Sequence, residues 1–121
     1  MKLSDLDWGE AETGGLLNAT WSVAEARFAH RGRPCVAVEW YRRTGHPFHP
    51  YASLVLIAGE CDRTADGTLL RQIAFGSVAG AGEGAGAARV LQSAVLGRKI
   101  VLIEDPASRE MELDAALDAI L

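Results

Sequence analysis

Residues 35–60 read CVAVEWYRRTGHPFHPYASLVLIAGE and contain the clearest strand patterns of the chain. Residues 35–43 alternate as in a half-buried β-strand, with large apolar side chains on one face (Val36, Val38 and Trp40) and a mixed set on the other (Ala37, Glu39 and Tyr41). Residues 44–51 carry two prolines, which cannot donate hydrogen bonds to a sheet, so we expect a loop there. Residues 53–60 contain a continuous apolar run, which predicts a strand in the middle of the sheet, covered on both faces.

The segment before residue 35 extends this sheet. Residues 20–30 fit two patterns, a helical apolar stripe and the alternation of a strand. The turn sequence that follows, Arg31-Gly32-Arg33-Pro34, favours the strand. We therefore expect a strand-turn-strand unit that joins residues 20–30 to residues 35–43.

Two further strands are predicted after residue 60. The pair Asp66-Gly67 indicates a turn, and residues 68–75 would then form a hairpin with the strand at residues 53–60. Residues 100–103 (IVLI) form another wholly apolar run and predict a second central strand.

Two helices are predicted in the second half of the chain. Apolar residues recur at helical spacing through residues 87–95, and Gly97 is a suitable C-terminal stop. Asp105-Pro106 would start a last helix, because an acceptor cap precedes a proline at the first helical position. The side chains expected to face inward from this helix are Leu113, Ala116, Leu117, Ile120 and Leu121.

These elements give the order β-β-β-β-α-β-α and an α+β fold. We expect one domain over residues 1–121, with an irregular N-terminal arm at residues 1–18 that holds at most one helical turn. The simplest arrangement is a mixed, largely antiparallel sheet with two helices packed on one face, which buries two single-sided helices at once. The strand order does not follow from the sequence.

Composition and charge narrow the function classes. Hydrophobic residues make up 49% and charged residues 23% of the 121, an ordinary composition for a globular domain. The start MKLSDLDWGEAE lacks the features of a signal peptide, and the longest apolar run, residues 52–59, is far below the roughly 20 residues of a membrane-spanning helix. We therefore expect a small soluble cytoplasmic protein without membrane association.

Cysteine and histidine positions give no support for a metal or cofactor site. Cys35 and Cys61 stand apart, without a second cysteine or a histidine at metal-ligand spacing, so we interpret both as free thiols. His46 and His49 lie in the proline-containing loop with nothing to fix their geometry. We expect no metal, no cofactor and no catalytic residues.

A glycine-rich segment at residues 76–86 (GSVAGAGEGAG) begins two overlapping windows with the spacing G-x-G-x-x-[GA], from Gly80 to Ala85 and from Gly82 to Ala87, and the candidate ligand-binding glycines are Gly80, Gly82 and Gly84. With the predicted helix behind it and Glu104 after the next strand, residues 80–105 resemble part of the first β-α-β unit of the dinucleotide-binding Rossmann family. The resemblance implies that the glycines approach a pyrophosphate and that Glu104 accepts from a ribose hydroxyl. Four strands precede the segment, however, and Glu83 would lie among the phosphates, so we favour a connection that binds no ligand.

Charge is segregated along the chain. The net charge of -4 argues against generic nucleic-acid binding, although aromatic residues among the central arginines could form a stacking platform. Acids dominate from residue 104 onward, with one spaced every fourth residue on the last predicted helix. We expect two opposite patches to bind a protein partner or another copy of the chain: the arginines Arg31, Arg33, Arg42 and Arg43, and the acids Glu110, Asp114 and Asp118.

The hypothesis that follows is a non-enzymatic protein-interaction or assembly subunit, an oligomer that presents a basic hairpin face and an acidic C-terminal helix. The alternative is a small nucleotide- or phosphate-binding enzyme that uses the glycine-rich loop at residues 76–86. Whether the protein is an enzyme is left open, and the interaction hypothesis is favoured because no catalytic constellation is recognisable.

Overall fold

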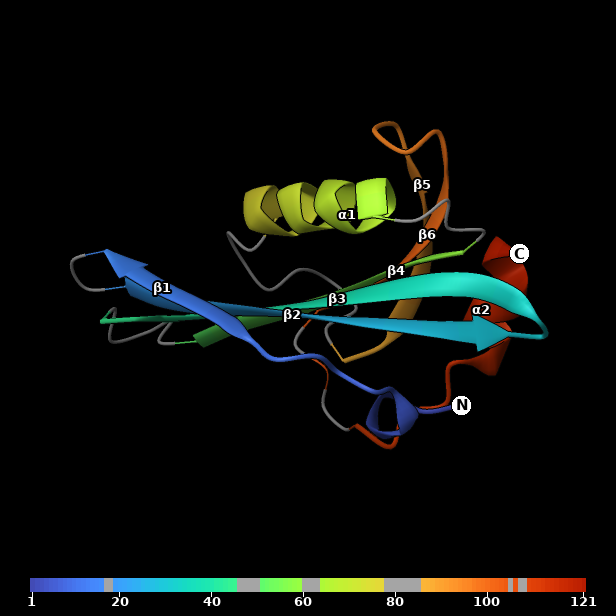
Figure 1. Cartoon of the computed structure of the whole chain (residues 1–121), viewed down its shortest axis with the longest axis horizontal. Helices are drawn as coiled ribbons and strands as arrows, with labels where there is room; N and C mark the ends of the chain where they lie inside the picture. The colour runs from blue at the N-terminus through green and yellow to red at the C-terminus, as the bar shows by residue number, and fades with distance from the viewer. Residues whose placement is uncertain (17–18, 46–50, 60–63, 78–85, 105, 107–108) are drawn as a thin grey trace.

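In the part of the chain that the structure describes, the strands form one six-stranded sheet in which every neighbouring pair is antiparallel (Figure 1). This computed structural model describes residues 1–16, 19–45, 51–59, 64–77, 86–104, 106 and 109–121. The predicted α+β class and the largely antiparallel sheet are confirmed. The elements are a 3-10 turn η1 (Leu3–Asp5), the strands β1 (Glu12–Leu16), β2 (Ala19–His30), β3 (Arg33–Thr44), β4 (Tyr51–Gly59), β5 (Ala88–Ser93) and β6 (Arg98–Glu104), and the helices α1 (Thr64–Ser77) and α2 (Asp114–Ile120).

The strands follow the order β1-β2-β3-β4-β6-β5 across the sheet. β4 and β6 therefore both have a strand on each side, which confirms the two continuously apolar runs as interior strands. Leu56 of β4 lies directly opposite Leu102 of β6, and the two side chains are 1% and 8% exposed. β1 and β5 form the two edges of the sheet.

The long hairpin of β2 and β3 confirms the predicted strand-turn-strand unit. Its strands pair from Ala19 opposite Thr44 to His30 opposite Arg33. Arg31 and Gly32 form the turn with φ angles of 52° and 78°. Two successive positive φ values match the right-handed twist of the strands, and glycine adopts such a conformation without strain.

The two helices cover opposite faces of the sheet, so the prediction that both pack on one face is wrong (Figure 1). Alternate residues of β4 explain this: Leu56 packs in one hydrophobic cluster with Leu70 of α1, whereas Val55 packs in the other with Leu117 of α2. A strand that is apolar at every position has two apolar faces, and each of them needs a cover. We call these sides the α1 face and the α2 face.

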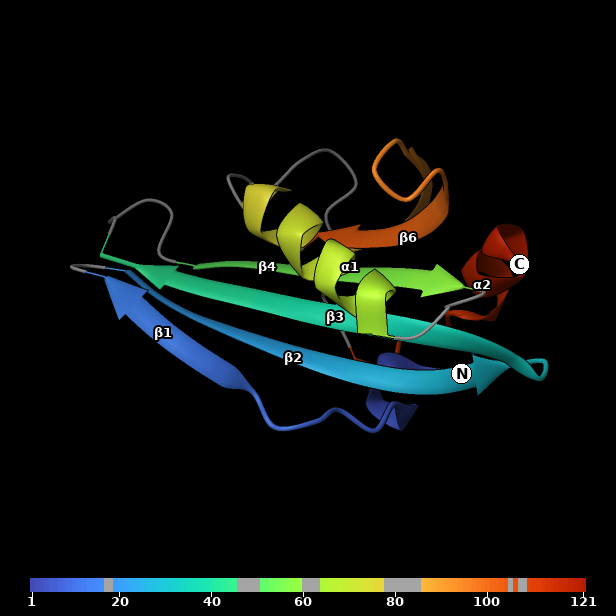
Figure 2. The same cartoon turned by 45° about the horizontal axis from the view of Figure 1, so that its top comes forward.

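The predicted strand at residues 68–75 is wrong, because this segment belongs to α1. Leu70 is fully buried and Ile73, three residues later, packs on the same cluster, so the helix presents one apolar side to the sheet. Gly67, read from the sequence as a turn residue, lies in the first half of the helix. α1 lies over β3 and β4 (Figure 2). A Cβ at Gly67 would fall 2.2 Å from Oε1 of Glu25, at the end of a side chain that extends from β2 toward the helix.

The predicted helix at residues 87–95 is also wrong, because residues 88–93 form β5. They pair with β6 along its length, from Ala88 opposite Ile103 to Ser93 opposite Arg98. Gly97 does end an element, but it does so as a hairpin turn residue with φ of 71°, where it donates its N–H to the carbonyl of Ser93 at 2.8 Å. Backbone pairing in the hairpin with β6 therefore overrides the helical spacing of the apolar residues.

The ends of the chain differ in part from the prediction. Leu3–Asp5 forms the one helical turn that was expected in the N-terminal arm, but Glu12–Leu16 is the edge strand β1 and not irregular chain. The last helix begins at Asp114, later than the predicted start at Asp105-Pro106. Four of its five predicted inward residues pack in the cluster of the α2 face, where Leu113 and Leu117 are fully buried and Ala116 and Ile120 are partly buried.

Neither helix, within the described residues, combines the length and the apolar character that crossing a membrane requires.

Candidate functional site

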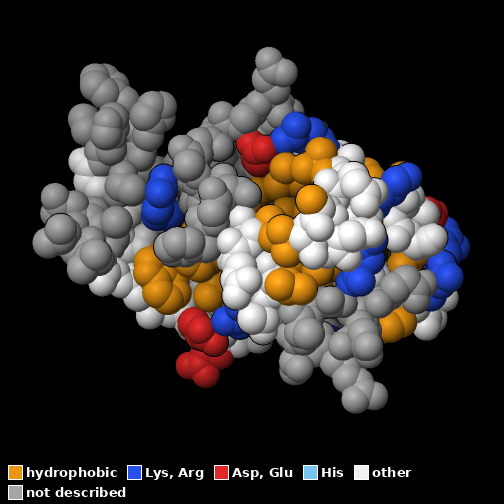
Figure 3. All heavy atoms as spheres, turned by 90° about the horizontal axis from the view of Figure 1, so that it is seen from above, with side chains coloured by type: hydrophobic (Ala, Val, Ile, Leu, Met, Phe, Trp, Pro, Cys, Tyr) orange, Lys and Arg blue, Asp and Glu red, His pale blue; other side chains and the backbone are white. Residues whose placement is uncertain are grey.

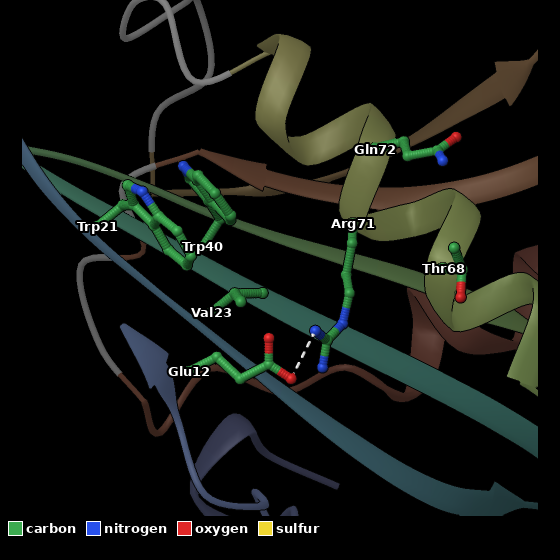
Figure 4. A pocket seen from close by; sticks show the side chains of 7 residues that line it. All are labelled: Glu12, Trp21, Val23, Trp40, Thr68, Arg71 and Gln72. Atoms are coloured by element: carbon green, nitrogen blue, oxygen red, sulfur yellow. Dashed lines mark ion pairs between the residues drawn. The ribbon is translucent and has the colours of Figure 1, made fainter. Parts of the chain in front are cut away.

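A pocket opens on the α1 face between α1 and the strands β1, β2 and β3 (Figure 4). Its volume is about 390 Å³. Seven residues line it: Glu12, Trp21, Val23, Trp40, Thr68, Arg71 and Gln72. Seen from the α1 side, exposed hydrophobic side chains gather in patches that Lys and Arg side chains border (Figure 3).

Two stacked tryptophans form the apolar wall of this pocket. The rings of Trp21 and Trp40 are 5.3 Å apart between centroids and inclined by only 12°. Trp21 belongs to β2 and Trp40 to β3, and both point toward α1 (Figure 4). A Cβ at Gly14 would fall 2.2 Å from an atom of the Trp21 ring, so the edge strand β1 needs glycine at this position to seat the indole.

An ion-pair network closes the opposite side of the pocket. Arg71 of α1 reaches down to Glu12 of β1, with 3.1 Å between Nη1 and Oε1 (Figure 4). The same guanidinium lies 3.4 Å from Oε2 of Glu25, and Glu25 also accepts a hydrogen bond of 3.0 Å from Arg27. Glu12 is 64% exposed, whereas Arg71 is 30% exposed, so the network runs from the pocket rim inward.

Exposed apolar side chains are concentrated at the edge strand β5. Among the described residues, four large hydrophobic side chains are more than a third exposed: Val90, Leu91, Val95 and Tyr41. Three of them belong to β5 or to the turn that follows it, and Val95 is the most exposed at 61%. Within the described residues, β5 pairs with β6 alone.

The predicted acidic residue Asp118 lies on the α2 face at the tip of the β2–β3 hairpin. Arg31 donates to it from Nε at 2.6 Å and from Nη2 at 3.1 Å, and Nε2 of His30 lies 2.7 Å from Oδ1. The Arg31 hydrogen bonds, followed by the contact with His30, hold the pKa of the Asp118 carboxyl well below its usual range. Asp118 thus connects α2 to the hairpin within one chain.

The other two predicted acids also have intramolecular partners. Asp114 accepts a hydrogen bond of 2.8 Å from the amino group of Met1, which lowers the pKa of its carboxyl. Glu110 pairs with Lys2 at 3.2 Å, and hydrogen bonding by Ser4 and then by Lys2 lowers its pKa as well. The acidic stripe therefore contacts the N-terminal segment and the hairpin tip.

The structure does not bring the four predicted arginines together. Arg31 occupies the hairpin tip, and Arg33 begins β3 beside it. Arg42 and Arg43 lie near the other end of β3, where Arg42 is opposite Trp21 in the register. The buried Nε of Arg42 has no hydrogen-bond partner.

The glycine candidates Gly80, Gly82 and Gly84 lie outside the described residues. Glu104, the predicted ribose ligand, pairs with Arg89 of β5. Because the segment behind the glycines is an antiparallel strand and not a helix, the Rossmann-type β-α-β unit that the sequence resembled is absent from residues 86–104. The pyrophosphate site lacks its helix N-terminus there.

Cys35 is buried in β3, as predicted, and its Sγ lies 3.6 Å from the carbonyl oxygen of Arg33. The other residues that were weighed as metal ligands, His46, His49 and Cys61, fall outside the described residues. Among the residues that are described, no three His, Cys, Asp or Glu side chains are grouped as metal ligands would be.

Part of the pocket could be anticipated from sequence patterns. Trp21 and Trp40 were among the aromatic residues considered for a stacking platform, and the structure stacks them on each other. Glu12 and Arg71 were missed, because they come from an arm expected to be irregular and from a segment expected to be a strand. Gly14 lies two residues after Glu12 and opposite Trp21. A glycine at this position is the sequence signal for the close contact between β1 and the Trp21 ring.

Comparison of the chain with protein-family models, with curated proteins and with solved structures finds no match. The functional argument therefore depends on the geometry of this chain alone.

Proposed function

We propose that the protein is a non-enzymatic assembly subunit and that two copies associate through the outer edge of β5. The observation that carries the proposal is the concentration of exposed apolar side chains, Val90, Leu91 and Val95, on an edge strand and its turn. An edge strand presents unpaired N–H and C=O groups that can pair with another chain. Apolar side chains beside such groups add the desolvated centre that stable interfaces have.

β5 also lacks the features that usually keep an edge strand from pairing. Its sequence, ARVLQS, contains no proline and no lysine. Its one charged residue, Arg89, is held by Glu104 of the neighbouring strand, so the strand offers no free charge to repel a second copy. The opposite edge, β1, is different, because Gly14 and Gly15 leave it without apolar side chains at its centre.

The arrangement that fits this edge is a twofold dimer. A twofold axis perpendicular to the sheet places the β5 strands of two copies side by side and antiparallel. The two sheets then continue as one, with Leu91 of both copies on the same face.

The contact between the arginines and the acidic helix remains a second, weaker proposal. The acids concerned each have a cation within their own chain, so a contact between copies has to replace these pairs. Exposed ion pairs contribute only about 0 to 1 kcal/mol, so such replacement gains little free energy. A contact of this kind would also be heterologous, which builds rings or filaments and not closed dimers.

Light scattering of purified protein, with size separation, tests the proposal. We expect the parent to have the mass of a dimer of the 12.9 kDa chain, and the double variant Val90→Glu, Leu91→Lys to have the mass of a monomer. Tyr41→Lys is the matched control, because Tyr41 is 37% exposed, close to the 38% of Val90 and Leu91, but lies on the interior strand β3. The control should keep the parent mass, and circular dichroism should show that all three proteins are folded.

Two outcomes contradict the β5 edge. One is a parent that stays monomeric at high concentration. The other is a dimer that resists the β5 variant but dissociates on Asp114→Arg with Asp118→Arg and is restored by Arg42→Glu with Arg43→Glu, which assigns the contact to the charged residues.

A further inference from the structure

The pocket on the α1 face has the size and the wall of a small-ligand site. Its volume of about 390 Å³ lies toward the lower end of the range for such sites, which is roughly 300 to 1,000 Å³. The wall is aromatic, and Trp40, at 6% exposure, is held in place by the core. A rigid aromatic wall binds a flat ring at little cost in side-chain entropy, because the indoles are already fixed by their mutual stacking.

The charges around the pocket select against a charged ligand. Glu12 and Arg71 line it with opposite charges that satisfy each other at 3.1 Å. An anion bound at Arg71 displaces Glu12 and lies beside its carboxylate, and a cation bound at Glu12 leaves Arg71 without this partner. An uncharged ligand preserves the pair.

Polar groups on α1 can still orient such a ligand. Thr68 and Gln72 lie one helical turn apart on the pocket side of α1, and both side chains can donate and accept hydrogen bonds (Figure 4). A hydroxyl and an amide match the single N–H or carbonyl of a neutral heteroaromatic ring without requiring a charge.

We propose that this pocket binds an uncharged, planar aromatic molecule of one or two fused rings, stacked against the wall of Trp21 and Trp40. The site is separate from the β5 edge, since no residue of β5 lines it. The inference therefore stands whether or not the protein assembles.

Titration with indole, followed through the indole N–H signals in a two-dimensional ¹H–¹⁵N NMR spectrum, tests the proposal. Trp21 and Trp40 report on the pocket, and Trp8 is an internal control because its ring donates to the carbonyl of Leu3 outside the pocket. We expect saturable shifts of the first two signals and none of the third. Indole-3-acetate and tryptamine, the negative and positive analogues of similar shape, should bind about tenfold more weakly.

A variant in which the pocket is filled provides a second test, which does not depend on the solubility of indole. Thr68 is an exposed position of α1, so Thr68→Trp fills the pocket without disturbing the core and should abolish the saturable shifts. Ala115→Trp, on the exposed side of α2, is the matched control and should bind indole as the parent does. Absence of saturable shifts in the parent, equal binding by Thr68→Trp, or tighter binding of a charged analogue would each overturn the proposal.

Discussion

The two faces of the sheet are closed in different ways. On the α2 face, the N-terminal segment and α2 lie against the strands, and ion pairs join Met1, Lys2 and Arg31 to acids near the C-terminus. On the α1 face, one helix spans the strands, and the gap between it and β1 is left as a pocket. The comparison indicates that the α2 face serves stability, whereas the α1 face has room for a ligand.

The largest expected effects come from the cores of the two faces. Leu70 and Leu117 are both fully buried, one under each helix, and truncation of a buried leucine to alanine typically costs about 2 to 5 kcal/mol. Chemical denaturation should show a loss of this size in the free energy of unfolding for Leu70→Ala and for Leu117→Ala. Because the sheet separates the two clusters, the double variant should be additive to within about 0.5 kcal/mol. A larger coupling would show that the faces are not independent layers.

A smaller effect is expected where β1 seats Trp21. Gly14→Ala places a methyl group within 2.2 Å of the indole ring, so the ring must shift and its stacking on Trp40 is disturbed. The cost should be about 1 to 3 kcal/mol, as for overpacking in a core, with a loss of near-ultraviolet circular dichroism from the stacked pair. Gly9→Ala is the control, since its methyl group would meet Glu25 at an ordinary 3.4 Å. An unchanged spectrum in Gly14→Ala would mean that the stacking does not depend on β1.

The smallest effect concerns the pH dependence of the α2 face. Because Arg31 and His30 lower the pKa of Asp118 in the folded state, this carboxylate stabilises the fold above its unfolded pKa near about 4, and the contribution is lost as the pH falls further. The melting temperature of the parent should therefore drop more between about pH 5 and about pH 2 than that of Asp118→Asn. Asp7→Asn, at an exposed position of the N-terminal segment, should keep the slope of the parent. Equal slopes of melting temperature against pH for all three proteins would show that Asp118 does not contribute to the loss of stability in acid.

Sequence patterns were reliable where alternation is followed by a clear turn sequence or where the strand is apolar throughout. The hairpin of β2 and β3 follows from alternation and from Arg31-Gly32, and the runs at residues 54–57 and 100–103 were correctly placed inside the sheet. The same runs imply two apolar faces. Placing both helices on one face therefore conflicted with a pattern that the sequence already contained.

The predictions were wrong between residues 64 and 95, where a strand was predicted for the segment that forms α1 and a helix for the segment that forms β5. Segments 68–75 and 87–95 are both short and rich in alanine and aliphatic residues, so local propensity separates them poorly. Their structures depend on the partners that they contact, because β5 pairs with β6 in a hairpin and α1 lies over β3 and β4. The pocket could not be predicted for the same reason, since Arg71 reaches Glu12 only if α1 is a helix.

The two-residue turn at Arg31-Gly32 also bears on the order of folding. It joins two strands of twelve residues, so the β2–β3 pairs nearest the turn form by closing a very short loop. Pairing β4 with β6 instead requires Leu54 to meet Glu104, across α1 and β5. Loop closure costs entropy that grows with length, and topologies dominated by local contacts fold faster. The β2–β3 hairpin can thus form before the rest of the chain is in place, whereas the contact of Asp118 in α2 with Arg31 at its tip closes a far longer loop.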